Sequence, residues 1–225
     1  MSNDLVMIYI FAVALIIGYL AGNVHGAFML GKIFKNMDIR KHGSGNSGTT
    51  NALRVFGLKL AIPTFVIDFF KAFLPVFFAS NIANFMLFEA MKVENLDVFK
   101  SEISISLQVI FAIGVLLGHN YPFVLKFKGG KGIACTVGIL AAINLYCGIT
   151  FAVMMIAIIA LTRYVSLASI ISAICTPIMI MLYTNEIRYL ILGLIIMVLA
   201  VYRHKANIVR LKNGTESKIG EKAKV

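Results

Sequence analysis

Two glycine-rich segments that carry cations interrupt an otherwise apolar chain. The first runs from Gly43 to Arg54 (GSGNSGTTNALR) and the second from Phe127 to Gly132 (FKGGKG). Glycine allows a backbone to expose its N–H groups to an incoming ligand, and arginine and lysine add positive charge. Together the two segments predict a site for an anion such as a phosphate group.

The first segment combines glycines, short hydrogen-bond donors and an arginine. A helix beginning near Thr49 would direct its partial positive charge at the same anion, and an arginine can grip a phosphate with two hydrogen bonds. A P-loop is excluded because GxxxxGK followed by Ser or Thr is absent, and an ordinary flexible loop is the alternative. From this segment we expect anion contacts by Gly43, Ser44, Gly45, Asn46, Gly48, Thr50, Asn51 and Arg54.

Two further groups of polar residues belong with these segments. Alone, a lysine-rich turn is often a topology signal or a lipid-headgroup contact, and His119 would be a packing histidine. His204 and Asn207 are three residues apart and would share a helix face. Arg203 could instead anchor its helix at headgroup level. The candidates added here are His119, Lys128, Gly129, Gly130, Lys131, His204 and Asn207.

The composition places this site in a membrane protein. Hydrophobic residues make up 60% of the 225 residues and the mean hydropathy is +0.89, outside the range of soluble domains. The apolar stretch from Leu5 to Leu30 has Asp4 and no basic cluster before it, so it predicts a retained helix and not a cleaved signal. We expect one all-α membrane domain over residues 1–225, with spans near 5–30, 60–83, 103–124, 132–147, 148–162, 165–183 and 187–202.

The turn between Tyr146 and Gly148 is weak, so the sequence could also be divided into six spans. The distribution of lysine and arginine among the loops favours seven spans and gives their orientation. Lysine and arginine concentrate in alternate loops, which the positive-inside pattern places in the cytoplasm. The N-terminus is then outside, the C-terminus is cytoplasmic, and the active-site loops 32–58, 125–131 and 203–214 share the cytoplasmic face. A nucleic-acid partner is excluded, because the cations are divided among short loops.

The remaining polar and small residues have structural interpretations. Cys135, Cys147 and Cys175 match no metal-ligand or disulfide pattern, so we expect packing residues and no metal. Gly18, Gly22 and Gly26 repeat every four residues and predict close approach of another helix. Asp68 and Lys71 are expected to form an ion pair within the membrane.

The motifs resemble those of the bacterial acyl phosphate:glycerol-3-phosphate acyltransferases. GSGNSGTTNALR, GHNYPFVLKFKGGKG, RYVSLASI and YRHKANIVRLKNG occur in the family's order, and the likeness runs from about Leu15 to Gly214. It implies a seven-helix enzyme of the bacterial cell membrane that transfers a long acyl chain to the 1-position of glycerol 3-phosphate, without a cofactor. It also carries site roles to Thr136, Arg163, Ser166 and Ser169; Cys135 replaces the family's alanine, and the tail beyond Gly214 has no expected role.

This chemistry needs oxyanion and phosphate stabilisation, which the first loop's amides, Ser44, Arg54 and Lys131 could provide. His119, His204 and the donor's own phosphate are the candidate bases, and we favour the phosphate. No histidine is followed five residues later by aspartate, as in soluble-type acyltransferases, which argues against acyl-CoA or acyl-carrier protein as donor. Ser44 has no neighbouring base to make it a nucleophile. A phosphate or organic-phosphate transporter and a non-catalytic lipid-binding protein are the alternatives, and the basic face could dock the enzyme that makes acyl phosphate.

Overall fold

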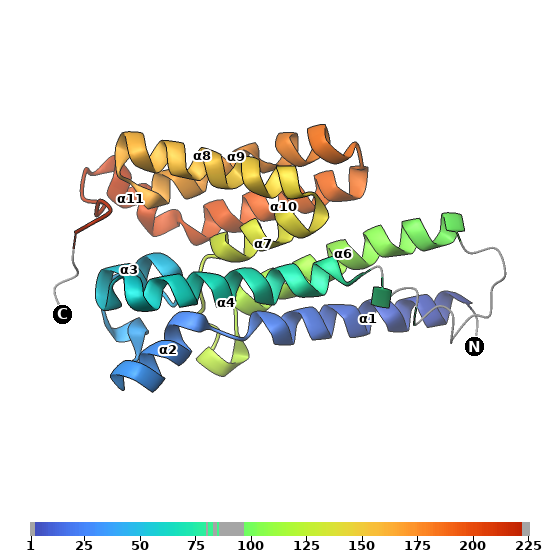
Figure 1. The fold of residues 1–225 in the computed structure, drawn as a ribbon, viewed down its shortest axis with the longest axis horizontal. Helices are drawn as coiled ribbons and strands as arrows, with labels where there is room; N and C mark the ends of the chain where they lie inside the picture. Colours follow the sequence, from blue (N-terminus) through green and yellow to red (C-terminus); the bar gives the residue numbers. More distant parts are fainter. Residues whose placement is uncertain (1–2, 80, 83–84, 86–96, 222–225) are drawn as a thin grey trace.

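The computed structural model describes residues 3–79, 81–82, 85 and 97–221. In this part of the chain the regular elements are all helices, joined by turns and loops, as the all-α prediction requires. The long helices lie side by side in two layers (Figure 1). One layer holds α1 (Asn3–Gly22), α4 (Leu58–Phe77) and α6 (Asp97–Asn120); the other holds α7 (Ile133–Ile143), α8 (Leu145–Thr162), α9 (Val165–Thr184) and α10 (Ile187–Arg203).

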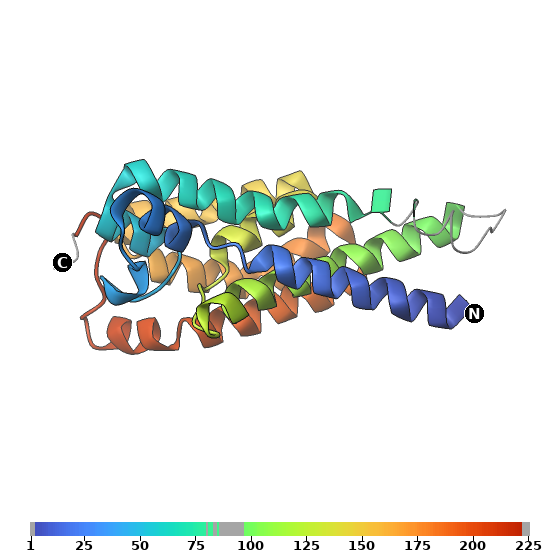
Figure 2. The same ribbon diagram turned by 90° about the horizontal axis from the view of Figure 1, so that it is seen from below.

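The short helices gather at one end of the bundle, opposite the start of α1 (Figures 1 and 2). They are α2 (Gly26–Lys35), η1 (Ile39–Lys41), α3 (Thr49–Phe56) and α11 (Lys205–Lys212), and η2 (Phe123–Leu125) follows α6. Hydrogen bonds join this end across long sequence distances: Arg203 binds the Gly130 carbonyl and Arg54 binds the Ser217 carbonyl. Both glycine-rich segments therefore meet at one end of the molecule.

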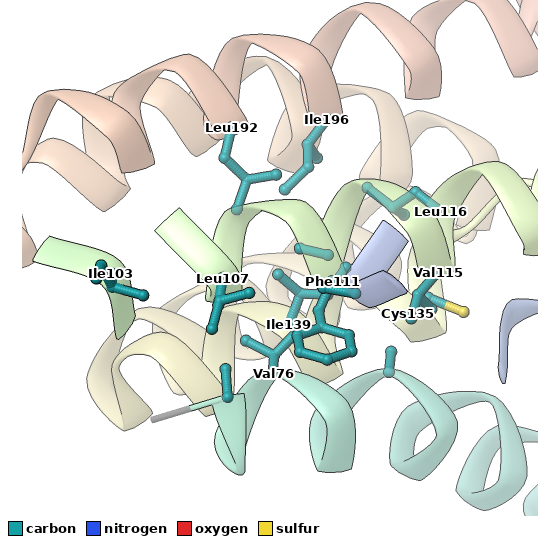
Figure 3. Packing of buried hydrophobic residues seen from close by; sticks show 14 of the residues in the cluster. Val76, Ile103, Leu107, Phe111, Val115, Leu116, Cys135, Ile139, Leu192 and Ile196 are labelled. Carbon is teal, nitrogen blue, oxygen red and sulfur yellow. The ribbon is translucent and has the colours of Figure 1, made fainter. Parts of the chain in front are cut away.

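Helix α6 is the centre of the packing. Its residues Leu107, Phe111 and Val115 are fully buried. Figure 3 shows these side chains between Leu192 of α10 on one side and Val76 of α4 on the other. Because α6 has partners on several sides, it is the element that fixes His119, its penultimate residue, relative to the other helices.

Glycines bring α1 and α6 into backbone contact, which confirms the predicted role of Gly18 and Gly22. A Cβ at Gly18 would lie 2.7 Å from the Phe111 carbonyl oxygen, and one at Gly118 of α6 would overlap the Tyr19 carbonyl. The prediction also holds for Gly26, which approaches a different helix: a Cβ there would lie 3.0 Å from the backbone of Thr64 in α4. Small residues allow such close packing between helices that share an apolar solvent.

The described chain contains five helices long and apolar enough to cross a membrane, spanning Leu5–Lys35, Leu58–Phe77, Ser101–Leu125, Leu145–Thr162 and Val165–Thr184. The pair α10 and α11, bent by 58°, makes a sixth if it is one span. Helix α7, in the predicted span 132–147, has only 11 residues. The expected turn between Tyr146 and Gly148 lies earlier, at Asn144, whose side chain accepts a hydrogen bond from the Cys147 N–H and caps α8. The predicted end of the second span near residue 83 falls partly outside the described residues.

Candidate active site

Asn51 organises the first glycine-rich loop. Its Oδ1 accepts a hydrogen bond from the Ser44 N–H at 2.8 Å, and its Nδ2 donates to the carbonyls of His42 at 3.0 Å and Asn46 at 2.9 Å. Gly43 has a φ of +58°, and a Cβ there would overlap Asn51 Oδ1. The sequence analysis expected the Asn51 amide to contact the anion. Its hydrogen bonds instead go to the backbone of its own loop and fix the shape of that loop.

The folded loop ends at the start of α3. The helix begins at Thr49, as expected, and Gly48 caps it without a side-chain hydrogen bond. Ser44, Asn46, Thr49 and Arg54 line one cavity with this helix end. A helix N-terminus presents unpaired N–H groups and a partial positive charge to an anion, so this wall of the cavity suits a phosphate.

The second glycine-rich loop is fixed against the end of α6. Gly130 donates its N–H to the His119 carbonyl at 3.0 Å, and a Cβ at Gly129 or Gly130 would overlap His119 atoms. Arg203 donates to the carbonyl oxygens of Gly129 at 3.0 Å and Gly130 at 2.8 Å. Glycine is thus required at these two positions because the loop packs closely against His119. The loop places the next residue, Lys131, at the cavity.

Lys131 enters the cavity from this loop. Its Nζ donates to Asn207 Oδ1 at 2.5 Å. Burial lowers the pKa of Lys131 to about 8, Glu216 opposes the shift, and Arg210, Arg54 and Arg203 add to it. A buried ammonium surrounded by other cations is stabilised when an anion binds.

Glu216 is the site residue that the sequence analysis missed, because no contribution was expected from the tail beyond Gly214. Its carboxylate accepts hydrogen bonds from Ser166 Oγ at 2.9 Å, Asn207 Nδ2 at 2.7 Å and Arg210 Nε at 2.7 Å. Burial alone would raise the pKa of Glu216. The three donors, of which Arg210 has the largest effect, lower the pKa by more than burial raises it, so the net shift is downward. The only sequence signal was that Glu216 is one of two acids, with Glu221, in an otherwise basic tail.

The polar groups occupy one part of a cavity of about 310 Å³. The rest of its wall is apolar and comes from α4, α7 and α8, through Phe65, Val137, Met155, Ile156 and Ile159. The side chain of Ile156 is also 66% exposed on α8, a helix apolar enough to cross the membrane. The cavity therefore suits a ligand with a phosphate group and a hydrocarbon chain.

A buried polar network extends from the wall of this cavity, where Asp68 and His119 line it. The predicted ion pair is confirmed: Lys71 Nζ is 2.7 Å from Asp68 Oδ1, and both side chains are almost fully buried. Lys71 also contacts His119 Nδ1 at 2.8 Å. The His119 ring stacks on His25, whose Nδ1 lies 3.2 Å from Ser47 Oγ in the first loop. The network links α4, α6 and both glycine-rich loops.

The cavity brings together most of the predicted side chains and leaves others in supporting positions. Thr136 Oγ1 donates to the Gly132 carbonyl at 3.0 Å, Arg163 pairs through its backbone with Ile219, and Lys128 is exposed. The predicted residues that line the cavity are Ser44, Asn46, Gly48, Thr50, Asn51, Arg54, His119, Lys131, Ser166, Ser169, His204 and Asn207. Those that do not are Gly43, Gly45, Lys128, Gly129, Gly130, Thr136 and Arg163.

The pKa of Lys131 predicts how anion binding depends on pH. The ammonium form binds a phosphate and predominates below pH 8, so affinity for glycerol 3-phosphate should fall about tenfold between pH 7 and pH 9. The ligand stays a dianion over this range, because its second pKa is about 6. Titration calorimetry of the purified protein measures this. Lys131→Arg keeps its charge and should bind with little pH dependence, and an equally steep decline in that variant would contradict the assignment.

Comparison with known proteins agrees with this geometry. The family model described as glycerol-3-phosphate acyltransferase matches residues 12–214. A glycerol-3-phosphate acyltransferase of Alkaliphilus metalliredigens is 38% identical over 94% of this chain and 97% of its own. One from Clostridioides difficile is 34% identical over 96% of this chain and 98% of its own.

The fold agrees as well. A crystal structure of PlsY, an integral membrane glycerol 3-phosphate acyltransferase, in its glycerol 3-phosphate form has a TM-score of 0.80 and 30% identity, covering 93% of this chain and 96% of that chain. The lysophosphatidic acid form of PlsY has a TM-score of 0.78, with 28% identity over 93% of this chain and 95% of that chain. The sequence match and the shared fold together show that this chain belongs to the glycerol-3-phosphate acyltransferase family.

Proposed function

We propose that this enzyme transfers a fatty acyl group from acyl phosphate to the 1-hydroxyl of glycerol 3-phosphate, giving lysophosphatidic acid and inorganic phosphate in the first acylation of phospholipid synthesis. The observation that carries the proposal is the single cavity whose wall is cationic at one part and apolar at another. Both proposed substrates have a phosphate, and one has a long hydrocarbon chain. The transporter alternative has no support among the relatives, which are acyltransferases.

The cavity contains groups for each part of this reaction. The oxygen of the 1-hydroxyl bonds to the acyl carbonyl carbon, and the bond from that carbon to the phosphate oxygen breaks. Negative charge develops on the carbonyl oxygen and moves to the departing phosphate. Arg54, Lys131 and the N–H groups at the start of α3 supply charge and hydrogen bonds for these oxygens.

The choice of donor can be tested with purified enzyme in detergent. With glycerol 3-phosphate present, palmitoyl phosphate should give equal amounts of lysophosphatidic acid and phosphate, whereas palmitoyl-CoA should give none. Lys131→Ala should lower the rate about a hundredfold or more, because a charged group of the site is removed. Lys212→Ala removes the same charge from an exposed position at the end of α11 and is the matched control. Product from palmitoyl-CoA alone would refute the proposed donor.

The route of the proton follows from the carboxylates near the site. Glu216 accepts hydrogen bonds from three side chains, which disfavours its protonation. Asp68 is ion-paired with Lys71 through Oδ1, and its Oδ2 has no hydrogen-bond partner among the described residues. The ion pair favours the charged carboxylate at Asp68. We assign the hydroxyl proton to the phosphate of the acyl donor, which leaves as inorganic phosphate. His204 is the protein group that competes for this role, because its Nδ1–H donates to the Ala200 carbonyl at 2.8 Å and leaves Nε2 as an acceptor.

Replacing His204 separates these two routes. Proton transfer to the donor's phosphate predicts that His204→Ala keeps kcat within about tenfold of the unchanged enzyme. A base at His204 predicts a loss of about a hundredfold or more with glycerol 3-phosphate binding intact. Single-turnover rates with palmitoyl phosphate, together with calorimetric binding of glycerol 3-phosphate, distinguish them.

The topology proposed with this function has seven spans over the single domain, the N-terminus outside, and the active-site loops in the cytoplasm of a bacterial cell. Helix α7 would be the short fourth span. The concentration of lysine and arginine at the end of the bundle that holds the cavity supports this orientation.

Cysteine labelling in intact cells tests the orientation. In a variant whose three native cysteines are replaced by alanine, Ile187→Cys at the start of α10 should react with a membrane-impermeant maleimide. Lys212→Cys, beyond the other end of α10, should react only after the cells are lysed. The reverse pattern would place the cavity outside the cytoplasm.

A further inference from the structure

The ammonium group of Lys71 is fully committed within the protein. Its Nζ lies 2.7 Å from Asp68 Oδ1 and 2.8 Å from His119 Nδ1, and it also bonds the Val24 carbonyl at the break between α1 and α2. An ammonium has three hydrogens, so these acceptors use all of them. Lys71 therefore acts on any ligand through its neighbours and not by direct contact.

This contact determines which nitrogen of His119 carries a proton. Lysine has no acceptor atom, so Nδ1 of His119 must accept the hydrogen bond and the ring proton must lie on Nε2. His204 has the opposite tautomer, because its Nδ1 faces the Ala200 carbonyl and must donate. The two histidines that line the cavity thus carry different groups at Nε2: an N–H donor at His119 and a lone pair at His204.

The donor of His119 lies next to the second glycine-rich loop. A Cβ at Gly130 would overlap Nε2 of His119. The imidazole ring therefore occupies the space that a side chain at position 130 would need. The described residues offer Nε2 no hydrogen-bond partner. The neighbouring carbonyls of Gly129 and Gly130 are bound by Arg203. His119 lines the same cavity as the cations Lys131 and Arg54.

We propose that His119 donates a hydrogen bond from Nε2–H to a phosphate oxygen of the bound substrate, and that Lys71 is the positioning residue that fixes this tautomer. An anionic oxygen is the ligand group that both an N–H donor and the adjacent cations favour. The identity of the substrate rests on the proposed function, but the tautomer does not. His119 is accordingly a binding group and not the catalytic base.

Nitrogen-15 NMR of histidine-labelled protein in detergent tests the tautomer without any turnover. The His119 signals, assigned with His119→Gln, should show an unprotonated Nδ1 and a protonated Nε2, and the His204 signals should show the reverse. Adding glycerol 3-phosphate or inorganic phosphate should shift the Nε2 signal of His119. In the double variant Asp68→Asn, Lys71→Met, which removes both buried charges together, the preference for this tautomer should be lost. A proton on Nδ1 in the unchanged protein would overturn the proposal.

A matched pair of substitutions tests the hydrogen bond itself. His119→Gln places an amide N–H near the position of Nε2, whereas His119→Leu places no polar group there. The leucine variant should lose about 10- to 100-fold in kcat/KM with palmitoyl phosphate, and the glutamine variant should recover most of that loss. A raised KM for glycerol 3-phosphate would place the bond on that phosphate, and a raised KM for palmitoyl phosphate on the donor.

Equal losses in the two variants, with both folded by thermal melting, would contradict a donor role. If acyl phosphate is not the donor, the result is different, because the unchanged protein would then be inactive with palmitoyl phosphate. In that case the phosphate-dependent shift of Nε2 decides the proposal: its presence supports the bond and its absence refutes it.

Discussion

Charge held beside a hydrocarbon layer is the constraint on which this structure depends. A lone ion in that setting is costly, so each buried cation needs partners or an anionic ligand. Lys71 has Asp68, and Lys131 has Asn207, which in turn binds Glu216. Asp68 also lines the cavity, but Lys71 balances its charge, so Arg54 and Lys131 have one further carboxylate beside them, that of Glu216. A phosphate can complete that balance.

The packing of the helices keeps these groups at one end of the bundle. Backbone contact between α1 and α6 at Gly18 and Gly118 and the central position of α6 hold His119 in place. Arg203, at the end of α10, binds the loop that follows α6. The second glycine-rich loop is thus attached to a helix that comes much later in the chain, which limits its freedom before a substrate binds.

Much of this arrangement was predictable from sequence, because local patterns encode it. Apolar length predicted most of the long helices, and the glycine-rich motifs predicted the segments that surround the cavity. The pairing of Asp68 with Lys71 followed from the cost of isolated charge in a membrane. The start of α3 at Thr49 agrees with the helix start that the sequence analysis considered there.

The remaining features depend on contacts between distant parts of the chain. Nothing in the local sequence of Asn51 says that its amide closes its own loop, and nothing near Lys71 says that His119 accepts its third bond. The length of α7 was overestimated because Asn144 begins a new helix through a cap that hydropathy does not register. Glu216 was missed because its three donors come from α9 and α11, which only the fold brings together.

The position of Glu216 along the chain separates membrane insertion from the completion of the site. Every apolar helix of the described residues precedes it, so a growing chain can place these helices in the bilayer before the ribosome adds this carboxylate. Until then Asn207 and Arg210 lack their shared acceptor, and Ser166 lacks the oxygen to which it donates. An inserted but unfinished chain would therefore have the apolar wall of its cavity before the hydrogen bonds of its polar part are complete.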